Sequence, residues 1–220
     1  MSKTNTHLVI TRFNENLYWT NQLLPKIDTR YIYNRGKNDI VFDDEKTIMY
    51  NEDNVGRESL TIFKHIYDHY NKLPDVLVFF QGQLNDRPDH PTLPLDTYFE
   101  CNINEIIGSL RVKDQSKNWF GNGENKYRIT VSQWCNKLGI DDKHGIYIRC
   151  NNFAIGKDVI RRFPKSYYKN ILENGFFYSQ NPFSAYFVEL SNINILIGSK
   201  SFKFLLTNNY YTTNEKYIIV

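Results

Sequence analysis

Cysteine is scarce in this sequence, and no long apolar run is present. The three cysteines, Cys101, Cys135 and Cys150, are widely spaced and form no CxxC pair. This indicates neither a zinc ribbon nor a disulfide framework, and it suits a reducing compartment. No segment approaches the roughly 18 apolar residues of a membrane-spanning helix, and residues 1–13 lack the apolar core of a signal peptide. We therefore expect a cytoplasmic protein without a membrane span.

Charge is not concentrated anywhere along the chain. The formal net charge is only +3, and the basic residues are scattered without a dense Lys/Arg stripe. We therefore expect no nucleic-acid partner. The sequence also has no GxGxxG motif and no P-loop, which argues against a Rossmann dinucleotide enzyme and a Walker NTPase.

The first half of the chain predicts alternating strands and helices. A helix is expected over Glu15–Leu24, ending before Pro25, and a second one follows Asn54 as its N-cap, with an apolar stripe over residues 60–70. Apolar runs predict four strands, at His7–Thr11, Thr29–Tyr33, Thr47–Tyr50 and Val76–Phe80. This order favours an α/β fold with a mostly parallel central sheet flanked by helices.

The second half is less regular. Residues 84–128 are rich in Pro, Asp, Asn and Gly, which predicts long loops around a short helix near Asn104–Leu110. Strand character resumes over Lys143–Ile155, and a helix interrupted near Pro164 is expected over Lys157–Glu173. A last helix is expected to start at Asn181–Pro182, and the tail from residue 201 alternates weakly, like a terminal strand or arm.

Polar segments follow each of the four predicted strands. These segments are Arg12–Asn16, Asn34–Asp39, Asn51–Arg57 and Gln81–His90. In open α/β sheets ligands bind outside the carboxyl ends of the strands, and the segment ending at Arg57 also opens a helix whose free N–H groups suit phosphate. Arg35 and Arg57 would add charge-assisted hydrogen bonds. The sequence thus predicts a site for a phosphorylated small molecule, although polar loops of this kind also occur at strand ends without a ligand.

Four stretches of this half carry a resemblance to a known family. They are VITRFNEN, YIYNRGKND, NEDNVGRESLTIFKHIYDHY and PDVLVFFQG. Together they resemble the first half of a GT-A glycosyltransferase, and more closely a small, poorly characterised GT-A-like family with an R-[FY]-N-E start, a YN-[KR]-G loop, an N-x-GRE helix start and a strand ending in F-x-QG. The later stretches NNFAIGKDVIRRFPKSYY and NPFSAYFVEL also fit, so the resemblance covers most of residues 7–192.

The resemblance implies a single GT-A-like, Rossmann-like domain over residues 1–220. Residues 7–83 would form the nucleotide-sugar-binding half, and residues 84–200 would form the acceptor and loop half. The implied activity is transfer of a sugar from a nucleotide-sugar donor to a hydroxyl group of a glycan or protein. The implied donor-binding residues are Arg12, Asn14, Glu15, Asn34, Arg35, Gly36, Asn54, Gly56, Arg57, Gln81 and Gly82.

The sequence departs from the GT-A pattern after the fourth strand. GT-A enzymes generally carry Asp-x-Asp there, to hold a divalent cation against the diphosphate, whereas this chain has Gln81–Gly82. An amide cannot supply anionic charge, and Mn²⁺ or Mg²⁺ prefers carboxylate oxygen. One alternative is that Asp86, Asp89 and His90 provide the metal ligands a few residues later, although they fit a surface turn equally well.

Two further alternatives avoid a metal. Arg35, Arg57 or a nearby lysine would replace the cation and make the enzyme metal-independent, or the module would bind nucleotide or glycan without turnover. A metal-dependent hydrolase built on Asp86, Asp89 and His90 is a weaker alternative, because these ligands are too few for a two-metal site.

An inverting transfer also needs a carboxylate that removes the acceptor proton. Glu189 is the first candidate, because the resemblance includes a Glu at this place, and Asp89 is the second. An ordinary helix-surface carboxylate explains Glu189 equally well. His65 and His69 are one helical turn apart and fit either a metal pair or structural histidines, and Cys150 is expected in the core.

Overall fold

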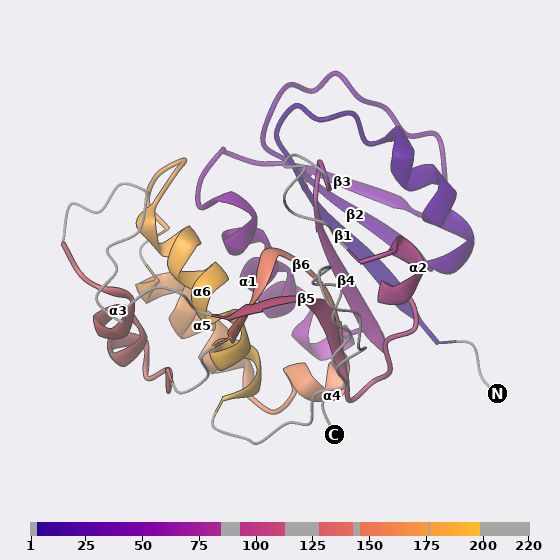
Figure 1. The fold of residues 1–220 in the computed structure, drawn as a ribbon. Helices are drawn as coiled ribbons and strands as arrows, with labels where there is room; N and C mark the ends of the chain where they lie inside the picture. Colours follow the sequence, from indigo (N-terminus) through magenta and orange to yellow (C-terminus); the bar gives the residue numbers. More distant parts are fainter. Residues whose placement is uncertain (1–3, 85–92, 113–127, 143–145, 176, 199–220) are drawn as a thin grey trace.

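A central sheet of four adjacent parallel strands, extended at one edge by an antiparallel strand pair, forms the core of this computed structural model (Figure 1). The structure describes residues 4–84, 93–112, 128–142, 146–175 and 177–198. Within these residues the strand order is β3-β2-β1-β4-β6-β5, and β6 runs antiparallel to both β4 and β5. The strands are β1 (Thr6–Arg12), β2 (Thr29–Asn34), β3 (Thr47–Asn51), β4 (Val76–Gln81), β5 (Ile106–Val112) and β6 (Ile146–Gly156). The protein is therefore α/β, with a mostly parallel mixed sheet.

Helices cover both faces of this sheet (Figure 1). The α-helices are α1 (Arg57–His69), α2 (Leu95–Tyr98), α3 (Val131–Leu138), α4 (Lys157–Ile160), α5 (Lys165–Asn174) and α6 (Phe183–Ile197), and the 3₁₀ helices are η1 (Tyr18–Lys26) and η2 (Tyr70–Lys72). One face packs against α1, α3, α4, α5 and α6, and the other packs against η1 and α2.

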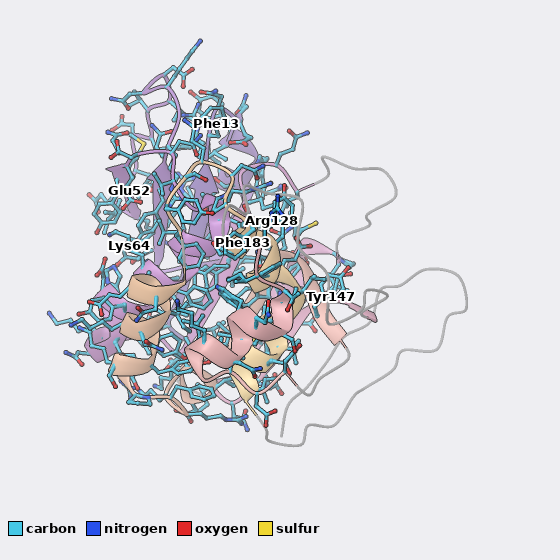
Figure 2. The ribbon with its side chains drawn as sticks, turned by 90° about the vertical axis from the view of Figure 1, so that its left-hand side faces the viewer. Phe13, Glu52, Lys64, Arg128, Tyr147 and Phe183 are labelled. Atoms are coloured by element: carbon cyan, nitrogen blue, oxygen red, sulfur yellow. The ribbon has the colours of Figure 1, made fainter. Side chains whose placement is uncertain are left out.

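Alternation along the strands builds these two cores. In β4, Leu77 and Phe79 point to the helical face that contains Phe63 and Trp134, whereas Val78 and Phe80 point to the opposite face. Successive side chains of a strand point to opposite faces, so an uninterrupted apolar run belongs to a strand that is buried on both sides. Figure 2 shows Phe183 at the centre of the helical layer, where its side chain is fully buried.

The four predicted strands of the first half are confirmed, but both helix starts are wrong. The first helix is the 3₁₀ helix η1, which begins at Tyr18 and includes Pro25. Glu15 stays outside it, because its carboxylate accepts the backbone N–H groups of Phe13 and Asn14 and holds them in a turn. The second helix, α1, is capped by Gly56 in a left-handed conformation (φ 71°) and not by Asn54.

In the second half, the segment near Asn104–Leu110 is strand β5 and not a helix. Pairing with β6 determines this, since Ile106 and Ile107 face Ile155 and Ala154 in the antiparallel ladder. The strand β6, the helix break at Pro164 and the helix after Pro182 are confirmed. The predicted tail from residue 201 lies outside the described residues.

Helix α3 is an element that the sequence analysis missed. Thr130 and Gln133 form a capping box, in which each side chain accepts the other residue's backbone N–H group. The T-x-x-Q spacing was an available signal for this helix start. In the described part of the chain, no helix has both the length and the apolar character needed to cross a membrane.

Candidate functional site

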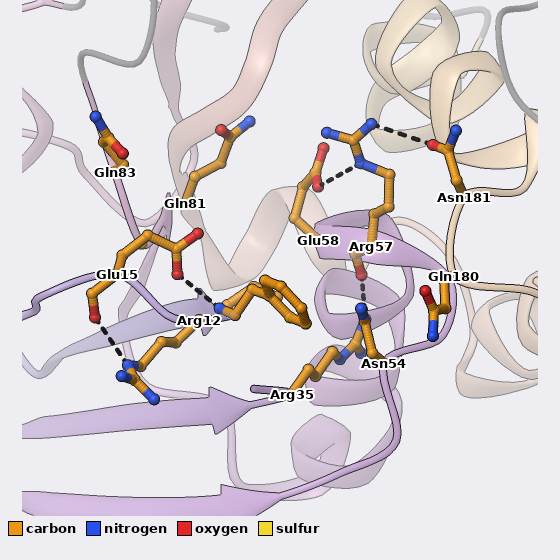
Figure 3. Close-up of a pocket in the computed structure, with 13 residues that line it drawn as sticks. Arg12, Glu15, Arg35, Asn54, Arg57, Glu58, Gln81, Gln83, Gln180 and Asn181 are labelled. Carbon is orange, nitrogen blue, oxygen red and sulfur yellow. Dashed lines mark hydrogen bonds and ion pairs between the residues drawn. The ribbon is translucent and has the colours of Figure 1, made fainter. Parts of the chain in front are cut away.

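A cavity of about 420 Å³ opens at the carboxyl ends of β1 and β4, beside the start of α1 (Figure 3). We call it the first cavity. Seven residues predicted to bind a donor line it: Arg12, Glu15, Arg35, Asn54, Arg57, Gln81 and Gly82. Two other lining residues, Phe13 and Gln83, fall within the predicted strand-end segments, and the sequence analysis missed four more, namely Thr11, Glu58, Gln180 and Asn181.

The other residues that were predicted to bind the nucleotide-sugar support the cavity from outside its lining. Asn14 accepts the backbone N–H of Lys37, and Asn34 accepts a hydrogen bond from Arg12. A Cβ atom at Gly36 would lie 1.2 Å from the carbonyl oxygen of Phe13, so only glycine lets these two loops approach so closely. Gly56 caps α1.

Arg12 ties the loops after β1 and β2 together. Its guanidinium is 3% exposed and donates to the carbonyl oxygen of Glu15 (2.8 Å), to Asn34 Oδ1 (2.7 Å) and to Lys37 O (2.7 Å). Its Nη2 also lies 2.6 Å from a carboxylate oxygen of Asp39, and this hydrogen bond lowers the pKa of Asp39. Arg12 therefore fixes the shape of the rim.

Arg35 connects the loop after β2 to the start of α1. Its Nη1 donates to the carbonyl oxygens of Val55 and Arg57, and its Nη2 lies 3.5 Å from Glu52. Burial lowers the pKa of Arg35, and the negative charge of Glu52 opposes that shift. The Nε–H group of Arg35 is buried and has no hydrogen-bond partner among the described residues. This orphan donor belongs to a side chain that lines the cavity.

Arg57 begins α1 with a backbone that is unusual for a non-glycine residue (φ 51°). Its guanidinium lies 3.5 Å from Glu58 and donates to the hydroxyl of Tyr186 (2.9 Å) and to Asn181 (3.3 Å). Burial lowers the pKa of Arg57, but the negative charges of Glu58 and Glu189 outweigh this effect, so that its pKa lies above the ordinary value. Strained backbone of this kind clusters at functional sites.

The start of α1 adds unpaired backbone donors to this wall. The first N–H groups of an α-helix have no carbonyl partner within the helix and carry a partial positive charge. Gly56 N–H is already bonded to the carbonyl oxygen of Ser179 (2.8 Å), which brings Gln180 and Asn181 to the cavity. The wall is thus suited to an anionic group.

Glu15 and Gly82 form the opposite wall. The Oε2 atom of Glu15 accepts backbone N–H groups at 2.6 Å and 3.2 Å. A Cβ atom on Gly82 would lie 2.6 Å from that same oxygen, so the glycine after β4 makes room for the carboxylate.

Gln81 is the last residue of β4 and lines the first cavity. Its side-chain amide donates to the carbonyl oxygen of Cys150 (2.7 Å), and the backbone N–H of Cys150 donates to Glu189 (2.8 Å). Cys150 and Asn151 have positive φ angles of 55° and 52°. Cys150 is half-buried at this irregular point of β6 and does not lie in the core as expected. Glu189, the first candidate base, supports this turn and is not part of the cavity lining.

The predicted metal ligands Asp86, Asp89 and His90 lie outside the described residues. Among the residues that are described, no group of three or more His, Cys, Asp or Glu side chains is placed to hold a metal ion. The described lining offers the carboxylates of Glu15 and Glu58, and Glu58 is engaged with Arg57. These residues do not fit a divalent cation.

His65 and His69 lie against a tyrosine cluster away from the cavity. Their ring centroids are 4.4 Å apart, and His65 Nδ1 lies 2.9 Å from the hydroxyl of Tyr33. The ring of Tyr31 contacts both histidines and His7.

Residues 8–138, more than half of the chain, match a protein family that is described only as protein of unknown function (DUF3431). The chain belongs to this family. The DUF3431 match runs from β1 to the end of α3, so it contains the lining residues of the first cavity except Gln180 and Asn181. No curated protein and no solved structure matches the chain.

Proposed function

We propose that this DUF3431 protein is a glycosyltransferase with a GT-A-like fold, which moves a sugar from a nucleotide-sugar donor to a hydroxyl group of a glycan or protein. The observation that carries the proposal is the first cavity, where seven residues that the resemblance assigns to the donor meet at the ends of parallel strands. Its volume of about 420 Å³ lies within the usual range for small-molecule sites.

The diphosphate of the donor would lie against the wall made by Arg35, Arg57 and the start of α1. The first N–H groups of α1 would donate hydrogen bonds to the diphosphate, and Arg35 lines the cavity beside them. The side chain of Arg57 is about two-fifths exposed. Its guanidinium can therefore bind a ligand while it also donates to the hydroxyl of Tyr186.

In the transfer step, the acceptor oxygen forms a bond to the anomeric carbon while the bond from that carbon to the phosphate oxygen breaks. The bonding electron pair leaves with the nucleoside diphosphate, and the acceptor proton passes to a carboxylate. Glu15 and Glu58 line the first cavity and are better placed for this than Glu189, which is bonded to the Cys150 turn. No step is assigned to a metal ion.

A binding module without turnover is the second candidate. It is favoured by Gln81, whose amide is held by the carbonyl oxygen of Cys150 at a place where a metal-dependent enzyme of this type would carry carboxylates. Such a protein would bind nucleotides with the same residues and release no sugar.

Calorimetric titration with nucleoside diphosphates and nucleotide-sugars, with and without Mn²⁺, tests the proposal. We expect one donor to bind and Arg57→Met to weaken it by about tenfold, the usual value of a hydrogen bond to a charged group. Arg161→Met is the matched control, because Arg161 is exposed after α4 and does not line the cavity. Absence of binding to every nucleotide would refute both candidates, and binding without transfer or hydrolysis would favour the binding module.

A further inference from the structure

A second cavity of about 450 Å³ adjoins the first one on the side of η1 and α2. The two share Glu15, Gly82 and Gln83 as a common wall. The other lining residues are Asn16, Trp19, Gln22, Leu84 and Leu95. A ligand in the second cavity would therefore meet a ligand in the first one across the end of β4.

Trp19 provides a flat apolar wall for this cavity. Its indole N–H donates to the carbonyl oxygen of Gly82 (3.1 Å), and its ring packs at a tilt against Phe80, with the centroids 6.1 Å apart. The polar edge of the indole is thus satisfied by the protein, so that what remains for a ligand is the ring surface. Leu84 and Leu95 extend the apolar surface.

The described polar part of the lining is neutral except for one carboxylate. Asn16, Gln22 and Gln83 are exposed amides, each of which can donate and accept hydrogen bonds. Among the lining residues that the structure describes, only Glu15 is charged, and its Oε1 has no hydrogen-bond partner within the same part of the chain. Three arginines line the first cavity, whereas no arginine of the described ranges lines the second.

This difference in charge separates the ligands of the two cavities. Glu15 would repel a phosphate in either cavity, but only in the first do described arginines offset this repulsion. A neutral sugar ring matches the lining, since its C–H face packs on an aromatic ring and its hydroxyl groups satisfy amides and an unpartnered carboxylate oxygen.

We propose that the second cavity binds a neutral saccharide ring stacked on Trp19. This deepens the proposed function and rests on it in one respect, namely that the bound ring is the acceptor of the transfer. Glu15 then lies between the acceptor hydroxyl in the second cavity and the donor in the first one, and Gly82 leaves room for this carboxylate.

The test uses the indole N–H resonance of Trp19 in ¹⁵N-labelled full-length protein, assigned with Trp19→Phe. The probes are methyl β-glycosides of glucose, galactose, mannose and N-acetylglucosamine. We expect at least one of them to shift the Trp19 resonance saturably. The Trp134 resonance should not move, because that side chain is fully buried and bonded to the carbonyl oxygen of Gly175.

Two matched glutamine variants locate the saccharide. Gln22→Ala, at an exposed position of the second cavity, should weaken saccharide binding by about tenfold, which corresponds to about one lost hydrogen bond. Gln180→Ala, at an exposed position of the first cavity, should leave saccharide binding unchanged. Equal effects of the two variants would overturn the proposal.

Two further outcomes would also overturn it. One is the absence of a saturable shift with all four glycosides. The other is a Trp19 shift caused by a nucleoside diphosphate alone, since the second cavity would then hold the base of the donor. A different result would refute the proposed function alone, namely saccharides that shift the Trp19 resonance while calorimetry finds no nucleotide binding.

Discussion

Acid should destabilise this protein over an unusual pH window, because its described histidines are held neutral by burial. Burial, followed by the positive charge of His69, lowers the pKa of His7 from 6.5 to about 4, although Asp28 opposes the shift. Burial also lowers the pKa of His65 and of His69. For His69, the negative charge of Asp68 raises the pKa and the positive charge of Lys64 lowers it further. His7 Nδ1 and His65 Nε2 are buried without a partner among the described residues.

The sign and size of the effect follow from proton linkage. Above pH 6.5 His7 is neutral in both the folded and the unfolded chain, so it contributes no pH dependence. Between pH 6.5 and about 4 the unfolded chain binds a proton that the folded chain does not, and the free energy of unfolding falls by at most about 1.4 kcal/mol per pH unit. His7 alone therefore removes up to about 3 kcal/mol, and below its folded pKa it removes no more.

Urea unfolding followed by circular dichroism, at half-unit intervals from about pH 7 to 4, measures this slope. His7→Gln should flatten the slope, since it removes a titrating group. Asp75→Asn should lower the stability at all these pH values without changing the slope above pH 5, because it breaks the ion pair with Lys157 (2.5 Å). A free energy of unfolding that stays level from pH 6.5 to 4.5, or parallel curves for wild type and His7→Gln, would refute the reasoning.

Three substitutions test other parts of the structure. Gly36→Ala should cost about 2 kcal/mol or more in urea unfolding, because the new Cβ would meet the carbonyl oxygen of Phe13; a smaller loss would show that the loops can separate. Gly82→Ala should displace Glu15 and weaken saccharide binding in the NMR titration, while the thermal midpoint of unfolding falls by only a few degrees. Unchanged saccharide binding would contradict the role of the wall made by Glu15 and Gly82. Trp134→Phe should cost about 2 kcal/mol in urea unfolding, because it leaves a small cavity and an unpaired carbonyl oxygen, and a neutral effect would be the contrary result.

Local patterns were sufficient for most of the parallel sheet. The strands β1 and β4 are buried on both faces, so each is a continuous apolar run. Such a run identifies a strand without knowledge of the strands that pair with it. The site could be predicted for a related reason. Arg12, Arg35 and Gln81 are separated in sequence, but parallel strands deliver their carboxyl ends to one edge, and the polar residues that follow them meet there.

Long-range pairing explains what the sequence analysis could not predict. The segment Ile106–Val112 contains no alternation strong enough to exclude a helix, and it is a strand because β6 lies beside it. Gln180 and Asn181 are held at the cavity by contacts across more than a hundred residues, since Ser179 accepts the N–H group of Gly56 and Asn181 accepts a hydrogen bond from Arg57. Neither pairing leaves a local signal in the sequence.

The arginines of the first cavity suggest how such a site would select its ligand. Arg12, Arg35 and Arg57 each lie near a carboxylate, at 2.6 Å, 3.5 Å and 3.5 Å respectively. These partners offset part of the positive charge and help to orient the guanidinium groups. Removing the carboxylate beside Arg12 or Arg35 would leave a buried charge uncompensated, which usually costs more than the pair contributes.

A ligand in the first cavity would then meet positive charge that is carried on hydrogen-bond donors fixed in place. The buried Nε–H of Arg35 has no partner among the described residues, and the first N–H groups of α1 are oriented by the helix itself. Fixed hydrogen-bond donors favour a ligand whose oxygen atoms match their positions, because no side chain has to be ordered on binding. Shape and hydrogen bonding, more than net charge, would therefore distinguish a nucleoside diphosphate from other anions at this site.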